Sequence, residues 1–201
     1  AGVVRELPGD DIEFGFPRSA GDHEARPENR AVAAFLAGDA PYTVHGSLHG
    51  MAFAPGPWFL IEAGWAHRTT AMRERLRERV REMDYPLFDP DRRGEKGFTR
   101  IDEGFTSRPD SDALRQHFLD RGDPETAARF RPSSMEHVRS LGGDPLTFVS
   151  EMPHFLLPPP GASCDFPDPA TGTAGRVAFH RWLADLLADR SAAEVARAAA
   201  R

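Results

Sequence analysis

Cysteine and lysine are scarce in this sequence: the first scarcity excludes cysteine-based structural sites, and the second indicates the kind of genome. The 201 residues include one cysteine, Cys164, which excludes an internal disulfide framework and a cysteine-based zinc knuckle. Lysine occurs once, at Lys96, among 25 basic residues, a bias that suggests a GC-rich bacterial genome. With a formal net charge of −6 the chain lacks the basic surface that binds nucleic acid or an anionic membrane, so we expect neither partner.

Long apolar runs are also missing. No run approaches the roughly 20 residues that a membrane-spanning helix needs. The N-terminus lacks the pattern of a signal peptide, so we expect a cytoplasmic protein. The first residue is Ala1 and not methionine, which suggests that an upstream segment has been removed. At 40% hydrophobic and 28% charged residues, the composition predicts a globular domain with a proper core.

The hydrophobic pattern predicts several helices and two strands. A helix is expected at 27–38, where a proline and an acid open the first turn. Strands are expected at 42–48 and 146–151, and an amphipathic helix at 64–85. Shorter helices are expected at 111–120, 124–130 and 133–141 and a last helix at 174–200, with a loop at 86–110 and a proline-rich linker at 158–169. This order predicts an α/β sheet, in which ligands bind beyond the carboxyl ends of the strands.

Two titratable residues near the ends of the predicted strands are the candidates for chemistry. A neutral imidazole at His45 is a natural zinc ligand, and Gly46 after it allows a ligand to approach the backbone. Beside a metal, the Glu151 carboxylate can take a proton from bound water and pass it to a leaving group. His49 is interpreted as a pocket residue. The plainer interpretation is that His45 hydrogen-bonds a neighbour and that Glu151 forms a salt bridge.

Four short segments resemble, in the same order, segments of the zinc carboxypeptidase family. Residues 11–17 (Asp-Ile-Glu-Phe-Gly-Phe-Pro) are similar to the family's Asp-Leu-Asn-Arg-Asn-Phe-Pro. Residues 26–32 (Arg-Pro-Glu-Asn-Arg-Ala-Val) are similar to its Glu-Pro-Glu-Thr-Arg-Ala-Val helix start. The run His45-Gly46-Ser47 resembles the His-Ser-Tyr-Gly strand end that supplies the third zinc ligand. Residues 146–151 (Leu-Thr-Phe-Val-Ser-Glu) resemble the Phe-Thr-x-Glu strand that carries the general acid/base.

This resemblance implies a mixed-sheet, three-layer α/β fold and a zinc-dependent hydrolase acting on a peptide or amide. Residues 1–160 would form the C-terminal part of the catalytic domain, incomplete on its N-terminal side. Residues 161–201 would form a linker and a helix packed on the same domain. His45 would complete the zinc site, and Glu151 would activate the metal-bound water.

The sequence departs from the family at positions that matter for chemistry. The family's first two ligands come from a His-x-x-Glu motif, which occurs nowhere in the 201 residues, so we expect a partner segment to supply it. Glu13 and Phe14 align with the Asn-Arg pair that grips a C-terminal carboxylate. Glu13 would repel a carboxylate and attract an amine, while Phe14 offers apolar contact to a substrate. Two other interpretations stay open: a metal-free binding or scaffolding module, and an α/β domain in which His45 and Glu151 have only structural roles.

Overall fold

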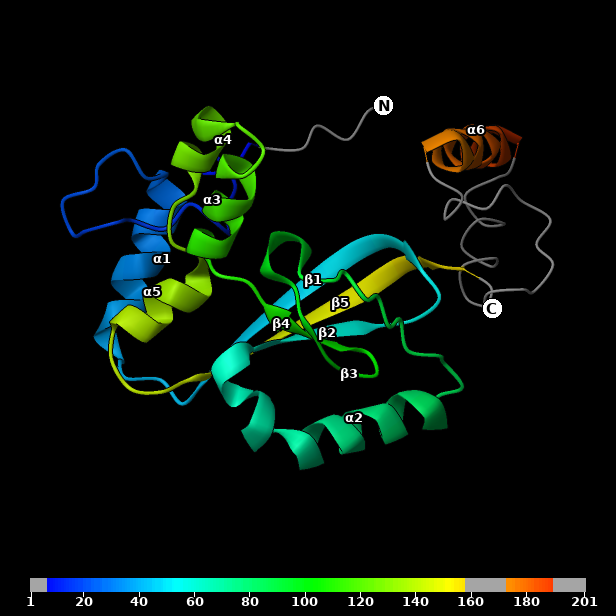
Figure 1. Ribbon diagram of the computed structural model, residues 1–201, viewed down its shortest axis with the longest axis horizontal. Coiled ribbons are helices and arrows are strands. Elements are labelled where there is room, and N and C mark those ends of the chain that lie inside the picture. Colours follow the sequence, from blue (N-terminus) through cyan, green and yellow to red (C-terminus); the bar gives the residue numbers. More distant parts are fainter. Residues whose placement is uncertain (1–6, 158–172, 190–201) are drawn as a thin grey trace.

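The computed structural model describes residues 7–157 and 173–189 and places five strands in one mixed sheet (Figure 1). In spatial order these strands are β1 (Val44–Ala54), β5 (Leu146–Leu156), β2 (Trp58–Glu62), β4 (Phe105–Arg108) and β3 (Arg100–Asp102). β1 and β5 are parallel, whereas β2 runs antiparallel to β5 and parallel to β4. The expected α/β class is confirmed.

The sheet is larger than the two strands predicted from sequence. The first strand was expected at 42–48, but β1 continues to Ala54, because its backbone pairs with β5 past Gly46 and Gly50. A regular ladder of this length outweighs the weak strand preference of glycine. β2 was not predicted, although its short, fully apolar beginning is typical of a buried strand. β3 and β4 lie inside the stretch predicted to be a loop.

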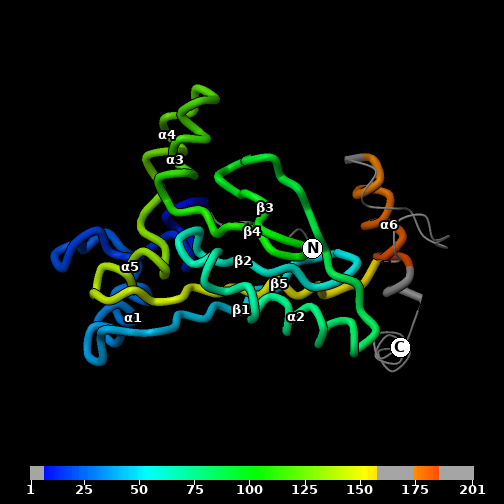
Figure 2. Tube along the Cα trace, turned by 60° about the horizontal axis from the view of Figure 1, so that its bottom comes forward, coloured from blue at the N-terminus to red at the C-terminus, as the bar shows by residue number. Residues whose placement is uncertain are grey.

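Four of the expected helices are present and gather at one end of the sheet in both views (Figures 1 and 2). They are α1 (Pro27–Gly38), α3 (Ser111–Leu119), α4 (Pro124–Arg129) and α5 (Ser134–Ser140). Side chains cap the last three: Asp110 and Asp123 each accept from a backbone N–H, and Ser133 forms a capping box with Glu136. These caps supply partners for the free N–H groups of short helices.

At the opposite end of the sheet lies α6 (Thr173–Asp189), which contacts the end of β1 (Figure 1). The ring centroids of Phe53 and Phe179 are 4.4 Å apart in an edge-to-face arrangement. The expected linker at 158–169 and the end of the last predicted helix lie outside the described residues. No helix within 7–157 or 173–189 is long and apolar enough to cross a membrane.

One face of the sheet is covered by α2 (Thr70–Glu82), which follows the 3-10 helix η1 (Ala63–Arg68). A single helix was expected over 64–85. The α2 side chains Met72, Leu76 and Val80 pack against Phe59, Ile61 and Phe105 of the strands, and this cluster is the main core. Spacings of four residues place the three α2 side chains on one stripe of the helix.

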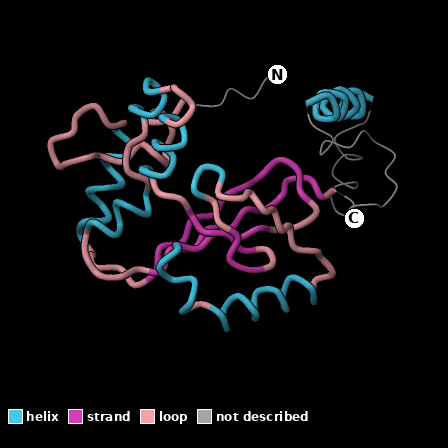
Figure 3. The backbone as a smooth tube through the Cα atoms, viewed as in Figure 1, coloured by secondary structure: helices cyan, strands magenta, loops and turns pink. Residues whose placement is uncertain are grey.

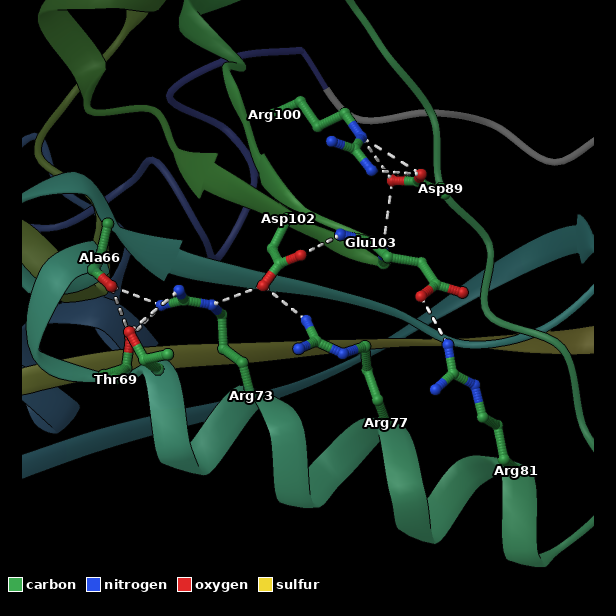
Figure 4. Close-up of polar contacts among 11 residues, drawn as sticks. Ala66, Thr69, Arg73, Arg77, Arg81, Asp89, Arg100, Asp102 and Glu103 are labelled. Carbon is green, nitrogen blue, oxygen red and sulfur yellow. Dashed lines mark hydrogen bonds and ion pairs between the residues drawn. The ribbon is translucent and has the colours of Figure 1, made fainter.

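A second stripe of α2 carries arginines that bind the β3–β4 turn (Figure 4). Arg73 and Arg77 share one carboxylate oxygen of Asp102, at 3.5 and 2.5 Å, and Arg81 contacts Glu103 at 2.5 Å. The side chains of Arg73 and Arg77 are only 8% and 14% exposed, although the charged face of an amphipathic helix is normally solvated. The hydrogen bond from Arg77 holds the pKa of Asp102 below its ordinary value against the opposing effect of burial. The backbone N–H of Glu103 and the charge of Arg73 lower it further.

The other face of the sheet is covered mainly by loops. A smaller cluster of Trp58, Leu60 and Val149 is packed there against partly buried side chains that include Phe88 and Phe98. These two phenylalanines belong to the long connection after α2, which contains the short 3-10 helix η2 (Glu95–Gly97) and is otherwise mostly loop in Figure 3. Loops over a rigid sheet are the usual setting of a binding site.

Candidate active site

A row of three side chains crosses the loop-covered face of the sheet. The strand register places His49 of β1 opposite Glu151 of β5, and Glu151 opposite Trp58 of β2. Because neighbouring residues in a strand point to opposite faces and paired residues to the same face, the three side chains lie side by side. Ser47, two positions earlier on β1, points to the same face.

His49 and Glu151 are in direct contact. The imidazole Nδ1 lies 3.2 Å from the Glu151 Oε1, and the other ring nitrogen, Nε2, lies 2.9 Å from the Ser47 hydroxyl. The hydrogen bond to Glu151 raises the pKa of His49 against the opposing effect of burial, with the Glu13 charge adding to the rise. The arrangement therefore favours an imidazolium held against a carboxylate.

Glu13 and Arg108 extend this cluster. Glu13 Oε1 lies 4.0 Å from the His49 Nε2 and 2.5 Å from the Arg108 Nη2. The Arg108 side chain, at the end of β4, is only 4% exposed, and its guanidinium lies 5.7 Å from the centre of the Phe14 ring. A buried guanidinium requires an anionic partner, and Glu13 supplies it.

A pocket of about 580 Å³ opens over this cluster. Its aromatic lining consists of Phe14, Trp58, Phe98, Phe118 and Phe130. Its charged lining consists of Asp11, Glu13, Arg92, Lys96, Arg108 and Glu151. The size and the combination of apolar walls with a few charged groups are typical of sites for small molecules or short peptide segments.

The structure separates His45 from this pocket. His45 is the second residue of β1 and pairs with Thr147, four residues along the strand from the row that holds Glu151. That separation is about 13 Å at the usual rise of a strand. Burial, followed by the nearby Arg108 charge, lowers the pKa of His45, and its Nδ1 has no hydrogen-bond partner among the described residues.

The expectation that His45 and Glu151 lie at the carboxyl ends of their strands was wrong. His45 is near the start of β1, and Glu151 is in the middle of β5. The reason is the length of the β1–β5 ladder, which continues well beyond both residues. Gly46, expected to contact substrate, is exposed on the opposite side of β1 and does not line the pocket. Glu13, Phe14, His49 and Glu151 do line it.

Sequence reasoning missed Arg108 and Trp58. Both are buried, and both belong to strands that were not predicted. The apolar run Trp58–Ile61 carried a usable signal for a buried strand. Arg108 carried none, because a charged residue in a polar, proline-containing stretch is normally read as solvated.

The donor set does not by itself fit a zinc ion. In the described part of the chain, no three histidine, cysteine, aspartate or glutamate side chains are grouped so that they could hold a metal. His49 stands between two carboxylates, but the nearer one bonds its Nδ1 and the other pairs with Arg108. The chain matches no known family profile, no curated protein and no solved structure.

Proposed function

We propose that this chain carries the proton-transfer residues of a hydrolase that cleaves a peptide or amide bond. The observation that supports this most is the contact between His49 and Glu151 at 3.2 Å, with both side chains lining one aromatic pocket. A carboxylate in reach of a pocket and held by a neighbouring imidazole is suited to general acid–base work.

Glu151 is the base in this proposal. Its carboxylate accepts a proton from a water molecule, whose oxygen forms the new bond to the carbonyl carbon of the substrate. Glu151 then donates that proton to the departing nitrogen as the carbon–nitrogen bond breaks, so the carboxylate is restored. His49 acts as a positioning residue, because its hydrogen bond fixes one carboxylate oxygen and leaves the other for the water.

If the hydrolase uses zinc, ligands from outside the described residues have to complete the metal site. A catalytic zinc needs about three protein ligands, and the described residues do not group three together. When bound, zinc would lower the pKa of its water and polarise the substrate carbonyl. In this proposal the ring nitrogens of His49 stay on Glu151 and Ser47, so His49 acts beside the metal by positioning Glu151 and is not itself a ligand. His45 does not line the pocket, so its expected role as a zinc ligand is not kept.

The partner segment expected to carry His-x-x-Glu has a natural docking place on this chain. β1 is an edge strand: among the described residues only β5 pairs with it. Its 11 residues contain no lysine, arginine, aspartate or glutamate, whereas edge strands are commonly protected by such residues. A strand added at this edge would place its side chains about 5 Å from those of β1, His49 included. This arrangement supports a carboxypeptidase-like domain completed by a further segment.

The competing proposal is a metal-free binding module. Two observations favour it. The described residues do not group three metal ligands, and the Arg108 guanidinium is paired with Glu13 and is not a free cation. Such a module would keep the pocket and bind a peptide or amide without cleaving it.

Parallel alanine variants of the two histidines decide between the proposals. Zinc affinity is measured by isothermal titration calorimetry on the wild type, His49→Ala and His45→Ala. Hydrolysis by the same three proteins is followed on a panel of N-acyl dipeptides and their amides. The hydrolase proposal predicts that His49→Ala weakens zinc binding and hydrolysis at least about tenfold, since residues that orient groups around a metal contribute on that scale. His45→Ala should leave both within about twofold. Zinc binding that is lost in His45→Ala and kept in His49→Ala would contradict the role given to His49.

A further inference from the structure

A serine that the proposed function does not use completes a line of hydrogen bonds in the site. The Ser47 hydroxyl lies 2.9 Å from the His49 Nε2, and the His49 Nδ1 lies 3.2 Å from the Glu151 Oε1. A hydroxyl, an imidazole and a carboxylate joined in this order through both ring nitrogens form the set in which an imidazole activates a serine as a nucleophile. Both distances fall within the range of roughly 2.6 to 3.2 Å that such a set requires.

The backbone ladder fixes where these three side chains stand. Ser47 and His49 are two residues apart on β1, so they point to the same face of the sheet. β5 is paired on both of its sides, by β1 and β2, and its register sets Glu151 opposite His49. A set of side chains carried by paired strands keeps its geometry better than one carried by loops.

The carboxylate selects the form of the imidazole that a serine nucleophile needs. Glu151 is an acceptor when it is ionised, so the His49 Nδ1 donates to it, and in the neutral ring Nε2 is left to accept the Ser47 proton. The hydrogen bond to Glu151 raises the pKa of His49 against the effect of burial, and the charge of Glu13 adds to the rise. His49 is therefore a stronger base than a free histidine, and its neutral form is populated above the raised pKa.

Ser47 is placed where a substrate can reach it. It is half-buried on β1, an edge strand among the described residues, and it stands beside the pocket that His49 and Glu151 line. The Leu146 N–H donates to the Thr43 carbonyl at 3.0 Å. Since backbone groups alternate in direction along a strand, the N–H groups of the residues before and after Ser47 point away from β5, to the open edge. Those donors are available to the negative oxygen that forms when a serine attacks a carbonyl.

We propose that Ser47 is a nucleophile that takes an acyl group from an aryl ester, with His49 as its base and Glu151 as the residue that orients His49. This activity goes beyond the proposed cleavage of amides: it shares His49 and Glu151 with that function but requires neither zinc nor a further segment. The aromatic lining of the neighbouring pocket favours an ester whose leaving group is aromatic.

The reaction has two steps that use the same proton path. In the first, the Ser47 Oγ bonds to the carbonyl carbon while its proton passes to the His49 Nε2. The carbon–oxygen bond of the ester then breaks, and His49 gives the proton to the departing phenol oxygen. In the second step, a water oxygen bonds to the acyl carbon and a water proton passes to His49. That proton returns to the Ser47 Oγ as the acyl–serine bond breaks, so an ester and water become an acid and a phenol.

Labelling by diisopropyl fluorophosphate and hydrolysis of 4-nitrophenyl acetate test the proposal on the full chain with EDTA present. The wild type should gain one phosphoryl group, as fluoride leaves and the serine oxygen bonds to phosphorus, and peptide mapping should place it on Ser47. Ser47→Ala should lose the label and cleave the ester at least about 100-fold more slowly, since the nucleophile is gone. His49→Gln should react at least about 100-fold more slowly, the contribution of a general base. Ser140→Ala, which changes an exposed serine that donates to the His137 carbonyl, is the matched control and should react as the wild type does.

The pH dependence of labelling provides an independent readout of His49. The charged and titratable groups around this imidazole are Glu151 of β5, Glu13, Arg108 of β4 and His45 of β1. Because only the neutral imidazole accepts the serine proton, the labelling rate should rise as the pH passes upward through the folded-state pKa of His49. Glu151→Gln removes the charge that raises this pKa, so it should move the rise to lower pH and reduce the limiting rate at least about tenfold.

Several results would overturn the nucleophile. These are a wild type that takes no label, a label on a residue other than Ser47, ester cleavage by Ser47→Ala at the wild-type rate, and a labelling rate that does not change with pH. If His49→Gln does not fold, judged by circular dichroism, Ser47→Ala and the position of the label still decide.

The same samples separate this proposal from the proposed amide hydrolase. Labelling of Ser47 in EDTA, together with no cleavage of any amide when zinc is added, would keep the nucleophile and reject the hydrolase. Amide cleavage that needs zinc, in a protein that takes no label and cleaves no ester in EDTA, would do the reverse.

Discussion

The contact between His49 and Glu151 predicts an energetic coupling that depends on pH. At 3.2 Å, Coulomb's law gives about 5 kcal/mol for unit charges at an effective dielectric constant of about 20. The side chains are 24% and 16% exposed, so the cost of removing both from water offsets most of this attraction. We expect a net coupling free energy of about 1 to 2 kcal/mol when the imidazole is charged.

The sign of the pH dependence follows from the raised pKa of His49. The folded protein holds the imidazolium proton more tightly than the unfolded chain, whose histidine titrates near 6.5. The stabilisation is therefore complete below that pH and is lost as the pH rises through the folded-state pKa of His49.

A double-mutant cycle measures the coupling directly. Urea unfolding of the wild type, His49→Gln, Glu151→Gln and the double variant, followed by circular dichroism, gives the four free energies of unfolding at pH 6 and at pH 9. The coupling should fall to about 0.5 kcal/mol at pH 9, the lower end for a hydrogen bond without the imidazolium charge. A coupling that is absent at pH 6, or equal at both pH values, would refute the reasoning.

Two other predictions concern residues outside the pair. Burial lowers the pKa of His45, so the wild type should lose stability relative to His45→Gln as the pH falls from 7 to 5, opposite to the trend for His49. If the wild type and His45→Gln show parallel pH profiles of unfolding free energy in urea, the prediction is contradicted. Asp102→Asn should destabilise the protein by about 3 kcal/mol, because two buried arginines lose their shared carboxylate. Glu103→Gln, which breaks the exposed pair with Arg81, is the matched control and should cost less than about 1 kcal/mol in the same thermal unfolding assay.

Much of the helical structure was predictable from the sequence because its signals are local. Pro27 opens α1, and Ser133 with Glu136 caps α5, and each of these is visible within one helical turn. The apolar stripe of α2 was also readable, whereas the burial of Arg73 and Arg77 was not. Their burial depends on Asp102, the last residue of β3, which is distant in the sequence and gives no signal at helical spacing.

The candidate site was only partly predictable for the same reason. Glu151 and His49 could be singled out as titratable residues in or beside apolar runs. Which histidine accompanies Glu151 is decided by the strand register, in which His49 and not His45 is the partner. A one-residue or four-residue offset between strands cannot be read from either strand alone. Arg108 reaches the site through β4, a strand of four residues whose sequence has no strong strand pattern.

Hydrolysis by the Glu151→Gln variant tests the central proposal most directly. The wild type and the variant are compared with zinc present on the same panel of N-acyl dipeptides and amides, after circular dichroism has established that both are folded. The proposal predicts that the wild type cleaves at least one member of the panel and that Glu151→Gln lowers the rate at least about 100-fold, the contribution of a general base. Cleavage by Glu151→Gln at a rate near that of the wild type, or no cleavage of any member by the wild type, would contradict it.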